Sequence, residues 1–160
     1  MGSRLQAVFG ALIVSGAALL LGGCSEDLGL DQHGQKVTSE RFENQWLVIN
    51  YWAEWCAPCR TEIPELNALA EQMKGQGVQV MGVNFDGLQG AELEKASRQM
   101  GIGFTVLAQD PSERFKLPRS EALPVTYILD ARGQVRDRLL GEQTAKGLSE
   151  RLAGLRQEKP

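Results

Sequence analysis

Two cysteines separated by two residues lie where a strand pattern gives way to a helical one. Residues 47–52 form a short β-branched and aromatic run, which predicts a buried central strand. From residue 63 onward, apolar residues recur at three- or four-residue intervals until Gly75, which predicts a helix. Cys56 and Cys59 therefore lie at the junction between a buried strand and the N-terminus of a helix.

This junction suits a reactive cysteine pair. Disulfide exchange proceeds through a thiolate, and the unpaired N–H groups and dipole of a helix N-terminus stabilise negative charge there. The two intervening residues let the sulfurs meet across one turn, and Pro58 fits the first turn, where its missing N–H has little effect. We expect Cys56 to be the exposed attacking thiol and Cys59, one turn further in, to be the more buried resolving thiol.

Half of a zinc site would have the same cysteine spacing. Zinc takes about four ligands, and beyond the pair the chain offers only Cys24 and His33. His33 lies in a polar turn and is expected to be a surface residue. A net charge of −3 gives no basic footprint for nucleic acid. We therefore favour a redox-active disulfide, with no metal, no other cofactor and no nucleic-acid partner.

The first 24 residues have the layout of an export signal. Arg4 precedes an uncharged run over residues 5–21, which ends in small residues. The sequence Leu21-Gly22-Gly23-Cys24 resembles a bacterial lipoprotein signal, in which cleavage precedes the cysteine and the cysteine is lipidated. An uncleaved N-terminal anchor with a spare thiol is the alternative. In both cases we expect the domain to lie outside the cytoplasm and to be tethered to a membrane.

The rest of the chain alternates between strand and helix patterns. Further strands are expected at residues 78–85, 104–107, 126–129 and 134–139, and further helices at residues 91–100 and 144–155. Residues 130–133 read Asp-Ala-Arg-Gly and predict a hairpin turn between the last two strands. This order predicts an α/β fold with a mixed sheet and helices on both faces.

The segment around the cysteines resembles the active site of thioredoxins. Residues 51–60 read Tyr-Trp-Ala-Glu-Trp-Cys-Ala-Pro-Cys-Arg, with Trp55 directly before the first cysteine. Pro64 matches the proline that kinks the active-site helix of that family, and residues 123–126 resemble the segment with its cis-proline. The resemblance implies a cis bond before Pro124, which would orient a substrate chain. A trans proline at the start of a strand is the alternative.

A closer resemblance is to the membrane-tethered TlpA/ResA group. Residues 56–64 match its CxxCxxExP pattern, and the interval from Cys59 to Pro124 is long enough for its extra helix and strand. Together with the export signal, this resemblance predicts a signal peptide at residues 1–23, a tether at 24–33 and a three-layer thioredoxin-like domain at 34–160. It implies catalytic roles for Cys56, Cys59, Glu62 and Pro124, and a substrate rim of Trp55, Ala57, Pro58 and Leu123.

One substitution bears on how protons are handled. Plain thioredoxins have a buried aspartate six residues before the first cysteine, where this chain has Asn50, whose amide cannot accept a proton. Glu62 follows Cys59 by three residues and shares its helix face, and the matching glutamate of the TlpA/ResA group tunes the protonation of the pair. We hypothesise that Glu62 is the proton shuttle for Cys59. The alternative is a first-turn acid favoured by the helix dipole.

The dipeptide between the cysteines bears on the direction of electron transfer. Ala57-Pro58 adds no charge and no polar hydrogen, so the thiolate is less favoured than in oxidising relatives with a histidine there. We expect a monomeric reductant at the periplasmic face of a bacterial membrane, anchored through Cys24. The resemblance implies exported substrates with cysteine pairs, such as apocytochrome c or copper-delivery proteins, and a membrane thiol donor of DsbD or CcdA type.

Two other functions stay open. The first is a disulfide-forming oxidant, which a redox potential near that of strong oxidants would select. The second is a copper-binding assembly factor of Sco type. That group has a wider CxxxC motif and a distal histidine, whereas no histidine follows His33 in this chain.

Overall fold

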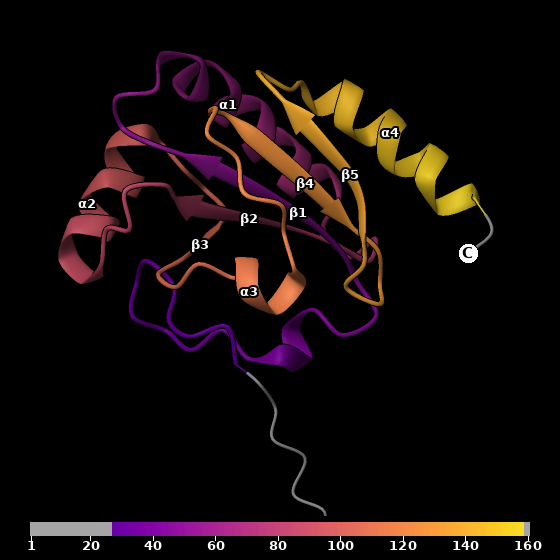
Figure 1. Cartoon of the computed structure of the whole chain (residues 1–160), viewed down its shortest axis with the longest axis horizontal. Helices are drawn as coiled ribbons and strands as arrows, with labels where there is room; N and C mark the ends of the chain where they lie inside the picture. Colours follow the sequence, from indigo (N-terminus) through magenta and orange to yellow (C-terminus); the bar gives the residue numbers. More distant parts are fainter. Residues whose placement is uncertain (1–26, 159–160) are drawn as a thin grey trace, which may run out of the picture.

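The computed structural model describes residues 27–158 and has a five-stranded mixed sheet in the order β3-β2-β1-β4-β5 (Figure 1). The central strand β1 pairs in parallel with β2 and antiparallel with β4. Strands β3 and β5 form the two edges. The strands are β1 (Trp46–Trp52), β2 (Val78–Asn84), β3 (Thr105–Leu107), β4 (Val125–Leu129) and β5 (Val135–Leu140). All five strands expected from the sequence are therefore present.

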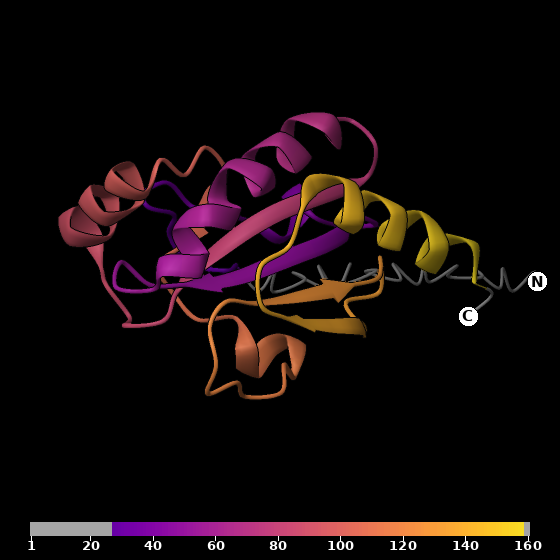
Figure 2. The ribbon, with the colours of Figure 1, turned by 90° about the horizontal axis from the view of Figure 1, so that it is seen from above.

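Three helices cover one face of the sheet. Helices α1 (Ala57–Gln72) and α4 (Ala145–Gln157) pack against each other over this face, and α2 (Gly90–Met100) lies beyond α1 (Figures 1 and 2). The apolar side of α1 meets both neighbours, because Leu66 packs in the same cluster as α4 whereas Ile63 packs in that of α2. Helix α2 and strand β3 are the extra helix and strand expected between Cys59 and Pro124.

The opposite face is covered by short and irregular segments. Among residues 27–158, its helical pieces are the one-turn helix α3 (Ser112–Phe115), seen in Figure 2, and the 3-10 turn η1 (Ser39–Arg41), beside which Phe42 packs edge-on against Phe115. The mixed sheet with helices on both faces is as predicted, but this second layer is thin. Pro111 and Pro118 bracket α3 and prevent a longer helix there.

The expected signal peptide, residues 1–23, and the expected lipidation site Cys24 lie outside the described residues. Within residues 27–158, no helix combines the length and the apolar character needed to cross a bilayer.

Residues 28–33, expected in the tether, pack into the domain. The Leu28 side chain is buried in the core cluster of the second face. The Gln32 side chain is also buried, donates to the carbonyl of Phe104 at 3.1 Å and accepts from the N–H of Val106 at 2.8 Å. The expected turn is present and leaves His33 exposed, 3.7 Å from Glu94. The packed part of the chain therefore begins before residue 34.

We predict that Gln32→Ala lowers the free energy of unfolding by about 2 kcal/mol, because it leaves the N–H of Val106 and the carbonyl of Phe104 without these hydrogen bonds. Urea unfolding followed by circular dichroism measures the change. Gln35→Ala is the matched control, since Gln35 is exposed in the same turn. Equal stabilities of the two variants would show that residues 28–33 are only a tether.

Candidate active site

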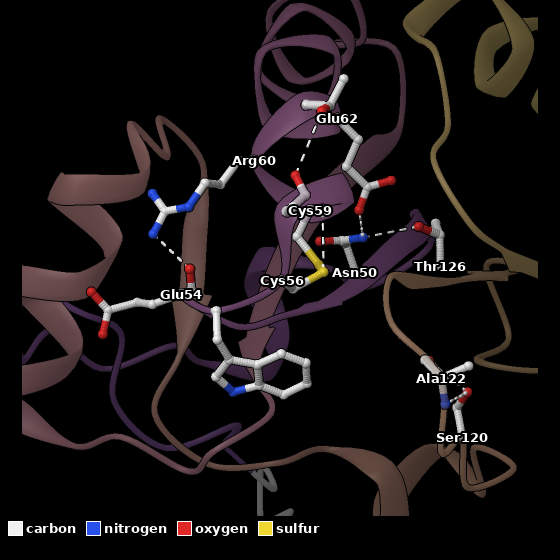
Figure 3. Close-up of a disulfide and its surroundings, with 12 residues drawn as sticks. Asn50, Glu54, Cys56, Cys59, Arg60, Glu62, Ser120, Ala122 and Thr126 are labelled. Carbon is white, nitrogen blue, oxygen red and sulfur yellow. Dashed lines mark hydrogen bonds between the residues drawn. A yellow bond between two sulfur atoms is a disulfide. The ribbon is translucent and has the colours of Figure 1, made fainter.

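Cys56 and Cys59 form a disulfide at the junction of β1 and α1, with their Cα atoms 5.3 Å apart (Figure 3). Cys56 is the N-cap of α1, and its Sγ accepts a hydrogen bond from the backbone N–H of Cys59 at 3.2 Å. The helix N-terminus is thus directed at the Cys56 sulfur. Both the N–H and the helix dipole would stabilise a thiolate on Cys56 after reduction.

Both cysteines are buried in the disulfide form. Cys56 is 4% exposed, so the expectation of an exposed thiol is wrong for this state, and Cys59 is 0% exposed. The pair packs in a cluster with Trp52 and Ile63, and Leu123 lies against it. The order of accessibility is still the expected one, because only Cys56 retains any solvent contact.

The expected rim residues lie around the pair. Ala57 is exposed, and Pro58 is half-buried in the first turn of α1. The Leu123–Pro124 peptide is cis, as expected, and Pro124 is buried directly before β4. The last residue pair between β1 and β4 is Tyr51 with Val125. The end of β1, which leads to the disulfide, and the start of β4, which the cis-proline precedes, therefore lie at the same end of the sheet.

Trp55 is the most exposed aromatic residue at the rim, with 65% of its surface accessible. Its Nε1 donates to the Asp86 carboxylate at 3.0 and 3.2 Å, and its ring meets Phe85 edge-on at 6.3 Å. Phe85 and Asp86 follow β2 and were not among the predicted site residues. Their position in the sequence could have predicted this contact, because both residues follow a strand parallel to β1, and the carboxyl ends of neighbouring parallel strands lie at the same edge of a sheet.

Glu62 is buried beside the pair, at 1% exposure. Its Oε1 accepts from the Asn50 amide at 2.7 Å (Figure 3). Its Oε2 accepts from the backbone N–H of Gln143 at 3.1 Å. The same Asn50 nitrogen donates to Thr126 Oγ1 at 3.1 Å. The carboxylate therefore joins α1 to β1, to β4 through Asn50, and to the loop before α4. Nothing in the sequence marked Thr126 or Gln143 as part of the site. Thr126 contributes a hydroxyl, which is common in strands, and Gln143 contributes a backbone N–H, which every residue except proline has.

Burial raises the pKa of Glu62 to about 7, although the hydrogen bonds from Asn50 and Gln143 oppose this and the charge of Glu142 adds to it. A carboxyl group with this pKa can both take and give a proton near neutral pH. The alternative of a first-turn acid is wrong, because α1 begins at Ala57 and Glu62 lies in its second turn.

The Asn50 side chain has one unsatisfied atom. Asn50 is fully buried, and its Oδ1 has no hydrogen-bond partner within the described part of the chain. Figure 3 shows this side chain between Glu62 and the cysteines. The sulfurs of a closed disulfide carry no hydrogen, so they cannot satisfy this acceptor in the oxidised state.

A profile described as the AhpC/TSA family matches residues 24–138. The chain belongs to this family. Thiol-disulfide oxidoreductase ResA of Bacillus thuringiensis subsp. konkukian (strain 97-27) is 30% identical over 122 residues, which cover 76% of this chain and 70% of ResA. With a closed Cys56–Cys59 pair at its site, the chain is a thiol–disulfide oxidoreductase of this type.

Solved structures agree on the fold. A thiol:disulfide interchange protein of the thioredoxin family from Chlorobium tepidum TLS superimposes with a TM-score of 0.69 at 20% identity, over 82% of this chain and 92% of that one. A secreted thiol-disulfide isomerase from Corynebacterium glutamicum has a TM-score of 0.65 at 25% identity, over 81% and 83% of the two chains. These likenesses establish the thioredoxin-like fold.

We predict that the stability of the oxidised protein falls by roughly 2–3 kcal/mol as pH rises from about 4.5 to about 7, and then stays level. In this interval the folded protein keeps a proton on Glu62 that the unfolded chain, with its ordinary pKa of 4.5, has already released. Urea unfolding at a series of pH values measures the slope.

Glu62→Gln should remove most of this slope, because the buried group then no longer titrates. Glu65→Gln is the matched control on the same helix, since Glu65 is less buried and accepts from the backbone N–H of Ala145. It should retain the wild-type slope. An unchanged slope in Glu62→Gln would contradict the assignment of this titration to Glu62.

Proposed function

We propose that this oxidoreductase reduces disulfides in exported proteins from the periplasmic face of a bacterial membrane. The observation that carries the proposal is the pairing of two features on one helix. Cys56, the more accessible cysteine of the pair, caps the N-terminus of α1, and the buried Cys59 shares a helix face with Glu62, a carboxyl group of pKa about 7. The helix N-terminus thus supports Cys56 as the nucleophile, and Glu62 serves Cys59 as the proton acceptor.

In the first step, the Cys56 thiolate attacks one sulfur of a substrate disulfide. The substrate S–S bond breaks, a mixed disulfide forms on Cys56, and the released substrate thiolate takes up a proton. In the second step, the Cys59 thiolate attacks Cys56 Sγ and expels the second substrate thiolate. The substrate gains two electrons, and the Cys56–Cys59 disulfide is closed.

The second step requires that Cys59 lose its proton inside the protein. Glu62 is proposed to take this proton, since its pKa of about 7 lies near neutral pH. Asn50 is proposed as a positioning residue with two contacts. Its amide nitrogen holds the Glu62 carboxylate at 2.7 Å, and its unpaired Oδ1 would accept the S–H of a reduced Cys59. Reduction would thus supply the donor that the disulfide form lacks.

The direction, location and partners of the reaction are also proposals. The uncharged Ala57-Pro58 dipeptide favours a reductant. The hydrophobic run and the Leu21–Cys24 sequence favour export, lipidation of Cys24 and tethering to a membrane. A protein that gives up electrons in an oxidising compartment needs a supply, which a membrane thiol donor of DsbD or CcdA type would provide. Apocytochrome c or copper-delivery proteins are the proposed substrates.

We predict that Cys59→Ser accumulates mixed disulfides with exported cysteine-pair proteins, because Cys56 can attack but nothing resolves the product. Non-reducing gels and mass spectrometry identify the trapped partners. Cys56→Ser is the matched control and should trap none, since the remaining thiol is inaccessible. Capture of no exported thiol protein, together with failure of the wild type to reduce a model disulfide, would refute the reductase proposal.

We predict that Glu62→Gln slows the resolving step about a hundredfold, because Cys59 loses its proton acceptor. Rapid mixing of the reduced protein with a peptide disulfide, followed by quantification of the mixed disulfide, isolates this step. The cysteine titrations should shift in the same variant. Glu65→Gln should behave as wild type. Unchanged titrations and rates in Glu62→Gln would exclude it as the proton acceptor.

A further inference from the structure

A cavity of about 380 Å³ opens on the sheet face opposite α1, next to the end of the sheet that carries the disulfide. It lies between the sheet and the segment that runs from α3 to the cis-proline. Figure 3 shows part of this segment, with Ser120, another lining residue, on the opposite side of the cysteines from Glu62. The lining residues used below are Tyr51, Phe85, Asp110, Arg119, Val125 and Tyr127.

The cavity is continuous with the rim of the active site. Phe85 lines the cavity and also contacts the exposed ring of Trp55, the residue directly before Cys56. Leu123 packs against two core clusters, one that contains both cysteines and one that contains Tyr51. Phe85 and Leu123 therefore connect the surroundings of Cys56 with those of the cavity.

One wall of the cavity presents a fixed hydrogen-bond acceptor. Asp110 Oδ1 accepts from the Tyr51 hydroxyl at 2.6 Å and from the backbone N–H of Ser112 at 2.8 Å. Burial and the Asp110 charge raise the pKa of Tyr51, so its hydroxyl stays a donor. Asp110 Oδ2 accepts no hydrogen bond from any of residues 27–158, so one oxygen of an oriented carboxylate remains available.

The cavity also contains an available donor and an apolar wall. Among the described residues, Arg119 has no hydrogen-bond or ion-pair partner, and it forms no ion pair with Asp110. Tyr51 and Tyr127 pack edge-to-face at 5.8 Å, beside Val125. An oriented acceptor and an exposed, unpaired donor beside aromatic side chains are a combination typical of binding sites.

A polypeptide segment matches these groups. Each peptide unit carries one N–H donor and one carbonyl acceptor, which complement the Asp110 carboxylate and the Arg119 guanidinium. An apolar side chain of the same segment would fill the space against Tyr51 and Tyr127. A simple anion or cation would satisfy only one of the two charged groups and would leave the aromatic wall uncovered.

We propose that this cavity binds the substrate polypeptide beside its reacting cysteines, and takes an apolar side chain while Asp110 and Arg119 bind the adjacent main chain. This inference rests on the proposed reduction of protein disulfides and adds a specificity site to it. The cavity discriminates proteins from small disulfides, because a small disulfide reaches Cys56 without entering it.

The test compares two disulfides with pre-reduced protein. One is a short peptide with an internal disulfide and a phenylalanine beside it, and the other is bis(2-hydroxyethyl) disulfide. In the double variant Asp110→Asn/Arg119→Gln, the second-order rate constant for the peptide should fall about tenfold or more, through loss of two charge-assisted hydrogen bonds. The rate constant for the small disulfide should stay at the wild-type value.

The matched control is Glu113→Gln/Arg98→Gln, which makes the same charge changes at exposed residues outside the cavity lining. A steric variant, Ser112→Tyr, fills the cavity and should abolish the preference for phenylalanine over glycine in the peptide. Circular dichroism and urea unfolding check that each variant is folded.

Unchanged peptide rates in both cavity variants would overturn the inference, as would equal losses for both disulfides, since the residues would then act on the disulfide chemistry itself. A wild-type protein that reduces the small disulfide but no peptide would refute the proposed function together with the cavity. That outcome is seen without any variant, so the two failures are distinguishable.

Discussion

A carboxyl group that is almost fully buried must obtain its hydrogen bonds from the protein, and Glu62 obtains them from two other parts of the fold. Asn50 binds it from the central strand, and Gln143 binds it from the loop before α4. A shift of α1 relative to the sheet would therefore leave a buried carboxylate unpaired. Because Cys56 caps this helix and Cys59 lies in its first turn, the same constraint fixes the disulfide relative to the cis-proline segment before β4.

The buried position of Glu62 also determines its protonation. The burial that makes the hydrogen bonds necessary also raises the pKa of Glu62 to about 7. Thioredoxins place their proton acceptor on the strand, whereas this chain has an amide there and a carboxylate on the helix. Asn50 is then part of the arrangement rather than a loss, since it orients the carboxylate and keeps one unpaired acceptor.

The sequence was informative where one local pattern decides the structure. The buried run of β1, the apolar periodicity of α1 and the cysteine pair between them predicted the centre of the fold and the redox site. The cis bond before Pro124 was predicted only through the family resemblance, because a lone proline leaves both isomers open.

Features that depend on distant contacts were not predictable in this way. Residues 28–33 look like a polar tether, yet the Gln32 side chain pairs with backbone groups more than seventy residues away. Cys56 is buried in a cluster that draws on α1, β1, α2 and β3, and Leu123 packs against this cluster from a distant part of the chain. Phe85 is read as the end of a strand, and only the assembled sheet places it against Trp55.

The packing of residues 28–33 has a consequence for the edges of the sheet. Along the outer side of β3, Leu30 accepts a backbone hydrogen bond from Ala108 at 2.9 Å and Gln32 donates one to Val106 at 3.0 Å. At the other edge, β5 carries the charged run Arg136-Asp137-Arg138. Unfolded chains tend to add strands to bare sheet edges. With one edge covered and the other charged, the sheet disfavours the addition of a further extended chain at either side, so the end that carries the disulfide can remain open without turning the sheet into a template for aggregation.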